Sequence, residues 1–348
     1  MTTHDDPAVC LRAIEFQPSW SFRRRLARVT AISGCIAAVW LAAGRAFAAG
    51  GGFTMENAYA DVHGLRPDAT WISDKIPSGV TAAENVVFDR IGSDTLKLDV
   101  YRPNDGKVRP LMVIVHGGGW ESGDRRMEKP LALRLAEIGY VAALVDYRLG
   151  PAGRFPNGVD DVKHAITWLR GKSATFGIDV AHVAIMGGSA GGHLAALISS
   201  WSGEHDTAAN RIWWVQAAVD IDGLADFTAP SMLAQQSHKP SAPTRFLGGS
   251  FRQRWNVWRD ASPIYHVNPE SAPTLFIRST AHSPLLPGRE RMEVLLRGLG
   301  IPTGMIVFPN TPHPFWLFDP WQMGIVKDTD NFLRVRLGWP VPAVSAAR

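Results

Sequence analysis

The sequence predicts an α/β fold with a mostly parallel, doubly wound sheet and helices on both faces. Short apolar runs alternate with stretches of helical periodicity along most of the 348 residues. Such runs, without polar alternation, are typical of strands buried on both faces of a parallel sheet. The repeated order strand, helix, strand belongs to such a domain, and 46% hydrophobic residues are enough to form its core. We expect one domain over residues 79–340.

The expected elements begin with a hairpin. Residues 85–91 and 95–101 alternate apolar and polar side chains around Gly92-Ser93-Asp94, as an antiparallel pair at a sheet edge does. The buried strands expected after it are 111–115, 141–145, 183–186, 215–221, 274–277 and 303–308. The expected helices are 130–138, 159–176, 190–201, 288–299 and 321–337. Residues 223–265 break this rhythm with Pro, Gln, Ser and Trp, so we expect a small cap-like insertion there.

The first 48 residues have the order of a secretory signal peptide. An arginine-rich stretch precedes an apolar run over 29–44, and the small-residue site Ala46-Phe47-Ala48 follows. The run is shorter than the ~20 residues of a membrane-spanning helix, so we expect cleavage and no stable membrane anchor. The predicted location is periplasmic or secreted. Residues 49–78 are Gly-rich and then irregular, which indicates a linker or N-terminal arm.

The signal peptide also accounts for the charge of the chain. The formal net charge is +4, and residues 1–48 hold six arginines against three acids, so they supply most of it. Both cysteines, Cys10 and Cys35, lie there too. The rest is near neutral and free of cysteine, which excludes thiol chemistry there and gives no electrostatic reason for nucleic-acid binding. No H-E-x-x-H or similar spacing occurs, so we expect no metal and no cofactor.

The strongest motif is Gly187-Gly188-Ser189-Ala190-Gly191-Gly192, between the expected strand 183–186 and the expected helix 190–201. A nucleophile elbow of the G-x-S-x-G type needs glycine two residues before and after the serine, because any side chain there would collide with the neighbouring backbone. Ser189 is therefore the predicted nucleophile, at the N-terminus of a helix. The alternative for a Gly-rich helix entry is a phosphate-binding turn.

A second glycine-rich turn, His116-Gly117-Gly118-Gly119-Trp120, follows the expected strand 111–115. Glycines let the backbone turn its N–H groups toward a tetrahedral oxyanion. The predicted donors are the amides of Gly118, Gly119 and Ala190. A plain glycine turn does not explain why this motif stands at the end of a strand ahead of the elbow, where the chemistry requires it.

The predicted general base is His313, because triads of this architecture run in the order Ser, acid, His, and His313 follows the last expected strand. His116 lies in the oxyanion turn and His193 within the helix after Ser189, so both are expected to have structural roles.

The acid is less clear. Its usual position follows the expected strand 274–277, but there the sequence has His282 where an aspartate is expected. Glu290 is the nearest carboxylate and is long enough to reach back to His313, so we predict it as the acid. Asp222, at the end of the preceding strand, is the second choice. A glutamate at a helix start is also commonly a capping residue, which leaves the assignment open.

Several segments together resemble an α/β-hydrolase of the HGGG-type esterase/lipase group. They are His116–Trp120, Tyr147-Arg148-Leu149, Phe155-Pro156, Asp160-Asp161 and the segment from Gly187 to Leu194. Asp220-Ile221-Asp222-Gly223, Gly288-Arg289-Glu290 and the segment from Thr311 to Phe318 further resemble exported acetylesterase-like hydrolases, a group of acetyl xylan and other carbohydrate esterases. The resemblance covers residues 85–337 and implies hydrolysis of carboxylic esters, with an Asp in relatives where Glu290 stands here.

The predicted function is that of an exported serine carboxylesterase acting through an acyl-enzyme on a small-molecule or carbohydrate ester. Trp120 and Trp316 flank the proposed oxyanion turn and base, and their rings could stack on a sugar, although buried tryptophans are commonly core. Two alternatives stay open. One is a catalytically impaired binding protein of the same fold, suggested by His282, and the other is a peptidase or amidase with the same triad.

Overall fold

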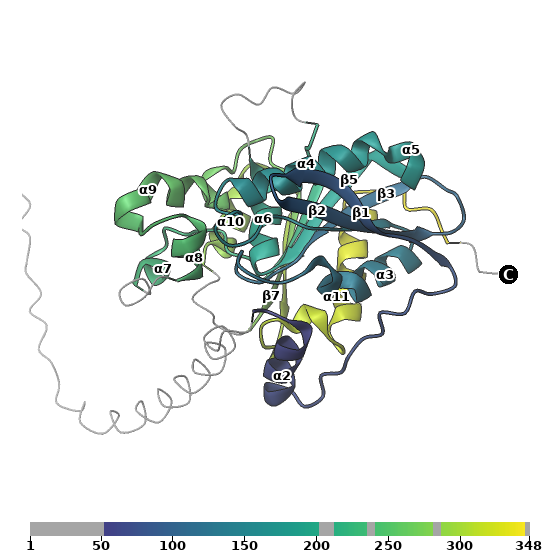
Figure 1. The fold of residues 1–348 in the computed structure, drawn as a ribbon, viewed down its shortest axis with the longest axis horizontal. Coiled ribbons are helices and arrows are strands. Elements are labelled where there is room, and N and C mark those ends of the chain that lie inside the picture. The colour runs from purple at the N-terminus through teal and green to yellow at the C-terminus, as the bar shows by residue number, and fades with distance from the viewer. Residues whose placement is uncertain (1–51, 202–211, 235–240, 281–286, 345–348) are drawn as a thin grey trace, which may run out of the picture. The chain divides into compact units, whose positions relative to one another are not determined.

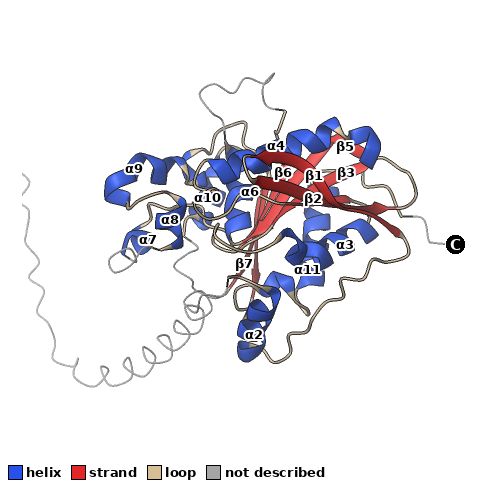
Figure 2. Cartoon of the chain, in the orientation of Figure 1, coloured by secondary structure: helices blue, strands red, loops and turns tan. Residues whose placement is uncertain are grey.

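The computed structural model describes residues 52–201, 212–234, 241–280 and 287–344. Its centre is an eight-stranded sheet in the order β1-β2-β4-β3-β5-β6-β7-β8 (Figures 1 and 2). β2 pairs antiparallel with both β1 and β4, and all other neighbours are parallel. The strands are β1 (Val80–Ile91), β2 (Asp94–Pro103), β3 (Arg109–Val115), β4 (Val141–Val145), β5 (Ile178–Gly188), β6 (Ala217–Ile221), β7 (Thr274–Ser279) and β8 (Thr303–Phe308). The predicted mostly parallel α/β sheet, with its antiparallel edge hairpin, is confirmed.

Helices cover both faces of this sheet. The main ones are α3 (Lys129–Glu137), α4 (Asn157–Gly171), α6 (Ala190–Ser200), α10 (Arg289–Gly298) and α11 (Gln322–Asn331), with the short α5 (Ser173–Phe176) after α4. Side chains of α4 and α6 share one apolar core with the sheet, and those of α3 and α11 share a second core. β3, β4 and β6 are buried along their whole length, because helices pack against both of their faces.

The segment between β6 and β7 holds the expected insertion. Its described part forms α7 (Pro230–Ala234), α8 (Ala242–Phe246) and α9 (Phe251–Asp260), followed by a short 3₁₀ turn, η3 (Pro263–Tyr265). The three helices, green in Figure 1, gather at one side of the domain next to α6 and α10. Phe227, Phe246 and Trp258 of this segment are buried in the same core as α6. The insertion is therefore packed onto the domain.

The N-terminal arm is more ordered than its irregular sequence indicates. It contains α2 (Met55–Leu65), which Thr54 caps by accepting a hydrogen bond from the Asn57 amide. Tyr59 of α2 packs against Phe318, and Thr70 pairs with Asp319 in an isolated bridge. The arm is thereby attached to the loop that follows β8.

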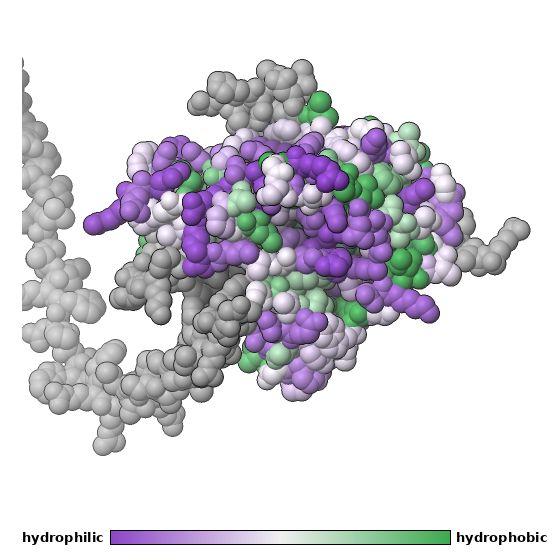
Figure 3. Space-filling model, viewed as in Figure 1, coloured by the Kyte–Doolittle hydropathy of each residue, from purple (hydrophilic) through white to green (hydrophobic). Residues whose placement is uncertain are grey.

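Three further short helical turns complete the described chain: η1 (Arg125–Glu128), η4 (Phe315–Leu317) and a π-helical turn, η5 (Phe332–Arg336), after α11. The predicted signal peptide, residues 1–48, lies outside the described residues. Among the residues that are described, no helix is long and apolar enough to cross a membrane. Figure 3 shows hydrophilic residues interspersed with small hydrophobic groups over the visible face of the domain.

Candidate active site

Ser189 lies between β5 and α6 in a strained turn. Its backbone has φ 56° and ψ −116°, a conformation that is costly for a residue with a side chain. The Ser189 amide donates to the carbonyl of Ile221 in the adjacent strand β6, at 2.8 Å, which ties the turn to the sheet. The structure therefore has the geometry of a nucleophile elbow at the predicted position.

The glycines around Ser189 are required by close approach. A methyl group at Gly191 would overlap the carbonyl of Val115, and one at Gly187 would overlap backbone atoms of Gly191 and Val115. A methyl group at Gly188 would overlap the indole ring of Trp316. The elbow thus fits against the end of β3 and against Trp316 only with glycine at these positions.

The turn after β3 presents two amides. His116 Nδ1 lies 2.7 Å from the Gly117 carbonyl, and the Gly118 carbonyl accepts from the amides of Glu121 and Ser122 at 3.2 and 3.1 Å. In a trans peptide the N–H points away from the C=O, so the amides of Gly118 and Gly119 face the opposite side. Within the described residues, neither amide donates a hydrogen bond to the protein.

Ala190 offers a third amide by the same reasoning. The Ser189 carbonyl accepts from the His193 amide at 2.9 Å, as the first hydrogen bond of α6. The Ala190 N–H therefore points out of the helix N-terminus, where the helix dipole favours negative charge. The turn and the elbow are adjacent, since a methyl group on Gly117 would lie 3.4 Å from the Ser189 Cβ.

His313 lies in the loop after β8, and Trp316 places it beside the elbow. The two rings meet edge to face with their centroids 4.9 Å apart, and the same indole packs against Gly188. The imidazole is 30% exposed, so it remains accessible to solvent and substrate. The buried indole of Trp316 therefore lies against both His313 and Gly188, the residue that precedes Ser189.

The carboxylate that faces His313 is that of Asp222. Asp222 Oδ2 lies 3.2 Å from His313 Nδ1, and the Asp222 side chain is fully buried. Its backbone has φ 49°, directly after the end of β6, and its amide donates to Ile277 of β7. Asp222 comes directly after β6, which pairs with β5. At this position its carboxylate meets the loop that carries His313.

Two more groups hold the Asp222 carboxylate. Its Oδ1 accepts from the Ser279 amide at 2.9 Å and from Arg289 Nη1 at 3.0 Å. Burial alone would raise the pKa of Asp222, but the contacts with His313, Arg289 and Ser279 outweigh it and lower the pKa to about 2. The carboxylate is ionised at neutral pH. Sequence reasoning missed Arg289 and Ser279, although Arg289 stands next to the predicted acid.

Glu290 does not face His313 in the structure. Its Oε1 accepts from Arg278 Nη1 at 2.6 Å, and its side chain is 55% exposed. Successive residues on a helix point about 100° apart, so on α10 the side chain of Arg289 faces inward and that of Glu290 faces outward. The geometry supplies the second choice, Asp222, in place of the predicted Glu290. His282 lies outside the described residues.

Comparison with known proteins places the chain in a family. The family model BD-FAE matches residues 98–288, more than half of the chain and including both glycine-rich turns. The chain belongs to the BD-FAE family.

The BD-FAE chain is also similar to individual esterases. Esterase LipQ of Mycobacterium tuberculosis is 32% identical over 264 residues, which is 69% of this chain and 59% of LipQ. The chain thus spans about three-fifths of the length of that relative. Among solved structures, butyrate-bound Est2, an esterase of Thermogutta terrifontis, has a TM-score of 0.62 at 24% identity over 76% of this chain and 96% of its own.

A truncated carbohydrate esterase from gut microbiota has the same fold. Its TM-score is 0.59 at 22% identity, and the match covers 74% of this chain and 98% of that one. At such identities the two structures show a shared α/β-hydrolase fold.

The two histidines of the glycine-rich motifs, His116 and His193, are buried and bonded to the protein. Burial lowers the pKa of His193 to about 4, so its ring is neutral. Its Nδ1 accepts from Trp120 Nε1 at 3.1 Å, and its Nε2 therefore donates to the Ala261 carbonyl at 2.8 Å. Burial also lowers the pKa of His116, which stacks on Tyr147. Both rings have the structural surroundings expected of them.

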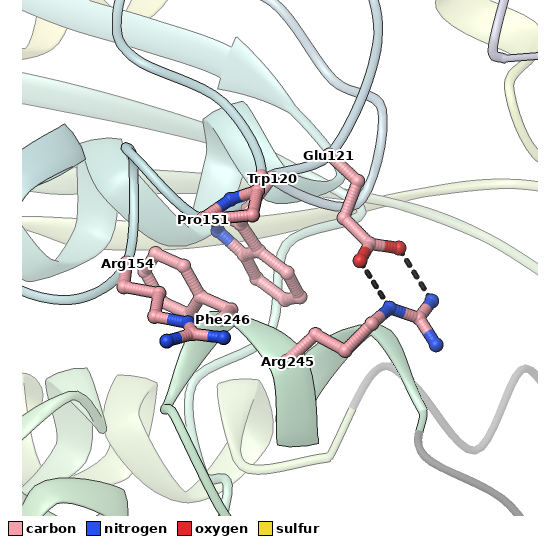
Figure 4. A pocket seen from close by; sticks show the side chains of 7 residues that line it. Trp120, Glu121, Pro151, Arg154, Arg245 and Phe246 are labelled. Atoms are coloured by element: carbon pink, nitrogen blue, oxygen red, sulfur yellow. Dashed lines mark hydrogen bonds and ion pairs between the residues drawn. The ribbon is translucent and has the colours of Figure 1, made fainter.

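The two tryptophans proposed for sugar stacking differ. Trp316 is fully buried, and its Nε1 donates to Glu128 Oε1 at 3.1 Å, so its face is not available to a sugar. Trp120 is only 6% exposed and stacks on Phe246 at 4.7 Å between centroids, but it lines an open pocket (Figure 4). Of the two, only Trp120 can contact a bound substrate.

Glu128, behind Trp316, is a buried acid that the sequence analysis did not consider. It is 2% exposed, and its Oε2 has no hydrogen-bond partner among the described residues. Burial raises its pKa to about 7, although the bond from Trp316 acts in the other direction. No group of three or more potential metal ligands occurs in the part of the chain that the structure describes.

Proposed function

We propose that the protein is an exported serine carboxylesterase, with Ser189 as nucleophile, His313 as general base and Asp222 as the acid of the triad. The observation that carries the proposal is the buried Asp222 carboxylate on His313 Nδ1, beside a strained serine elbow. This arrangement leaves His313 Nε2 as the ring nitrogen that can accept the serine proton. The esterases similar to this chain support the same activity.

The reaction follows from these positions. Ser189 Oγ attacks the ester carbonyl carbon while His313 Nε2 takes its proton, and the negative charge develops on the carbonyl oxygen. The amides of Gly118, Gly119 and Ala190 are the proposed donors to that oxygen. His313 then gives the proton to the leaving alcohol. Water, deprotonated by the same nitrogen, attacks the acyl-enzyme carbonyl, and His313 then gives that proton to Ser189 Oγ as the acid is released, which regenerates both residues.

Asp222 has two tasks in this scheme. It fixes the ring so that Nδ1 keeps its proton, and it stabilises the imidazolium that forms when Nε2 is protonated. Arg289 and the Ser279 amide keep the carboxylate ionised and oriented from the other side. The alternative of a binding protein without a working triad is not favoured, because a buried carboxylate is present beside His313.

Deacetylation of a polysaccharide or another small acyl ester is the proposed reaction. The signal-peptide pattern of residues 1–48 and the similarity to a carbohydrate esterase fold support an extracellular carbohydrate ester. Acetate release from acetylated xylan, acetylated pectin and a simple aryl acetate would rank these substrates.

The activity is tested with p-nitrophenyl acetate and a fluorophosphonate probe. The wild-type protein should release p-nitrophenol and be labelled at Ser189, and the Ser189→Ala variant should lose about 10⁶-fold in kcat and all labelling. Hydrolysis that survives in Ser189→Ala would overturn the mechanism. Export is tested separately, by N-terminal sequencing of the protein recovered outside the cytoplasm, which should begin near residue 49.

A further inference from the structure

An open pocket lies beside the oxyanion turn. It is a small depression with a cavity volume of about 60 Å³, and it is lined by Trp120, Glu121, Gly150, Pro151, Arg154, Arg245 and Phe246. In Figure 4 the indole of Trp120 and the ring of Phe246 lie together, with Arg154 on one side and Arg245 paired with Glu121 on the other. The pocket therefore combines an apolar floor with charged walls.

The floor of this pocket is connected to the proposed catalytic groups. Trp120 follows Gly119 directly, and its Nε1 donates to His193, one helical turn after Ser189 on α6. The Trp120 carbonyl also accepts from the Gly150 amide, at 2.9 Å. The pocket lining is therefore one residue along the chain from Gly119, one of the proposed oxyanion donors.

The charges in the pocket do not cancel. Glu121 and Arg245 form an ion pair with each other. The Arg154 side chain is exposed and has no carboxylate partner among the described residues. One cation in the wall of the pocket is therefore left for a ligand.

The backbone that carries Arg154 is held in place. The Arg154 carbonyl accepts from the Asn157 amide at 2.8 Å, and the next residue, Phe155, donates its amide to the Phe246 carbonyl of α8 at 3.0 Å. A methyl group on Gly153 would overlap the Arg148 carbonyl, so the chain is tightly packed on the other side too. A fixed backbone lowers the ordering cost of binding through this arginine.

We propose that Arg154 recognises a carboxylate on the substrate, so that the enzyme prefers esters that carry an anionic group beyond the scissile bond. This inference rests on the proposed esterase activity. A guanidinium binds a carboxylate through two parallel hydrogen bonds, which neither a neutral hydroxyl nor an acetyl group can match. The faces of Trp120 and Pro151 would contact the apolar spacer or sugar ring that joins the carboxylate to the ester.

The carboxylate can belong to either half of the ester. In the acyl half it would make the substrate a half-ester of a dicarboxylic acid, and in the alcohol half it would make it an acetylated uronic acid. Two matched pairs of substrates separate these sources: p-nitrophenyl hemisuccinate against p-nitrophenyl butyrate, and acetylated galacturonate against acetylated galactose.

The experiment measures kcat/KM for both pairs of substrates with the wild-type protein and with the Arg154→Gln and Glu121→Gln variants. The ratio to compare is kcat/KM for the anionic ester divided by kcat/KM for its neutral partner. Because Arg154→Gln removes one charge-assisted contact, we expect it to lower this ratio about 10-fold in one of the pairs. Glu121→Gln removes the carboxylate that repels an incoming anion and should raise the same ratio. The matched control is Arg252→Gln, an exposed arginine of α9 away from the pocket, which should leave the ratio unchanged.

An unchanged ratio in Arg154→Gln for both pairs, or an equal fall in Arg252→Gln, would overturn the proposal. Raising the salt concentration should reduce the wild-type preference, since the contact is at the surface. Failure of the esterase function looks different: neither neutral nor anionic esters would be hydrolysed, and the fluorophosphonate probe would not label Ser189. A wild-type protein that hydrolyses neutral esters without any anionic preference contradicts the Arg154 proposal alone.

Discussion

Two regions around Ser189 are organised in opposite ways. The site floor consists of the carboxyl ends of β5 and β6 with the start of α6. It is buried, and there the Asp222 carboxylate is bonded to His313, Ser279 and Arg289. The pocket wall, made by Glu121, Arg154 and Arg245, is solvent-accessible and carries excess positive charge. The difference indicates that the floor fixes the chemistry, while the wall is where substrate choice can vary without disturbing it.

The largest effect is expected from breaking the floor at Asp222. Asp222→Asn should lower kcat on p-nitrophenyl acetate about 10⁴-fold, because the amide no longer stabilises the imidazolium or fixes its tautomer. Glu290→Gln is the matched control and should change kcat less than about 2-fold, since Glu290 binds Arg278 at the surface. A larger loss in Glu290→Gln than in Asp222→Asn would reverse the assignment of the acid.

A smaller loss is expected from the oxyanion turn. Gly118 has φ 119°, and a methyl group there would overlap the Ser122 carbonyl, so Gly118→Ala must displace the turn. We expect kcat to fall about 10²–10³-fold, the usual effect of losing one donor. Gly171→Ala, at the end of α4 with open space around the α-carbon and no positive φ, provides the comparison and should retain far more activity. Steady-state kinetics would compare the two variants, and their melting temperatures would show that both are folded at the assay temperature.

A variant at Arg289 would test whether this cation keeps the Asp222 carboxylate ionised. Arg289→Met removes a cation that lies 3.0 Å from the Asp222 carboxylate. Without this charge the pKa of Asp222 should be higher than in the wild-type protein. Activity needs the ionised carboxylate, and so the acid limb of the kcat/KM profile should move to higher pH. Arg291→Met, an exposed residue on the same helix, should leave the profile in place.

The smallest effect concerns stability, at Glu128. In the folded protein its pKa is raised to about 7 from 4.5, so between these values the folded state holds a proton that the unfolded chain has lost. Raising the pH through this window should therefore lower the free energy of unfolding, by on the order of 2–3 kcal/mol. Glu128→Gln keeps an acceptor for Trp316 and should flatten this dependence in urea unfolding at pH 5 and pH 8. Parallel pH curves for the two proteins would contradict it.

The sequence was most informative where backbone contacts leave no choice of residue. The G-x-S-x-G spacing predicts the elbow because side chains at Gly187 and Gly191 would collide with neighbouring backbone, and in the structure both glycines lie against the Val115 carbonyl. Buried strands were predicted for the same kind of reason, since continuous apolar runs need cover on both faces.

Other features depended on orientation, which a single sequence does not specify. Whether Arg289 or Glu290 faces inward depends on the rotation of α10 against the sheet, and the sequence pattern treats the neighbours alike. The burial of Trp316 depends on packing against Gly188 and Glu128, which are far from it in sequence. Helix α2 had a usable signal, the cap residue Thr54 followed by apolar side chains at Met55, Ala58 and Val62.

The hydrogen bonds of His193 connect the cap to the catalytic turn. One neutral ring accepts from Trp120, next to the proposed oxyanion donors, and donates to Ala261, at the end of cap helix α9. If His193 Nδ1 takes up a proton, it becomes a donor that faces the N–H donor of Trp120. The two rings can then no longer share this hydrogen bond. Burial lowers the pKa of His193 and so keeps the ring neutral, which preserves a connection between the cap helix and the oxyanion turn through a residue outside the proposed triad.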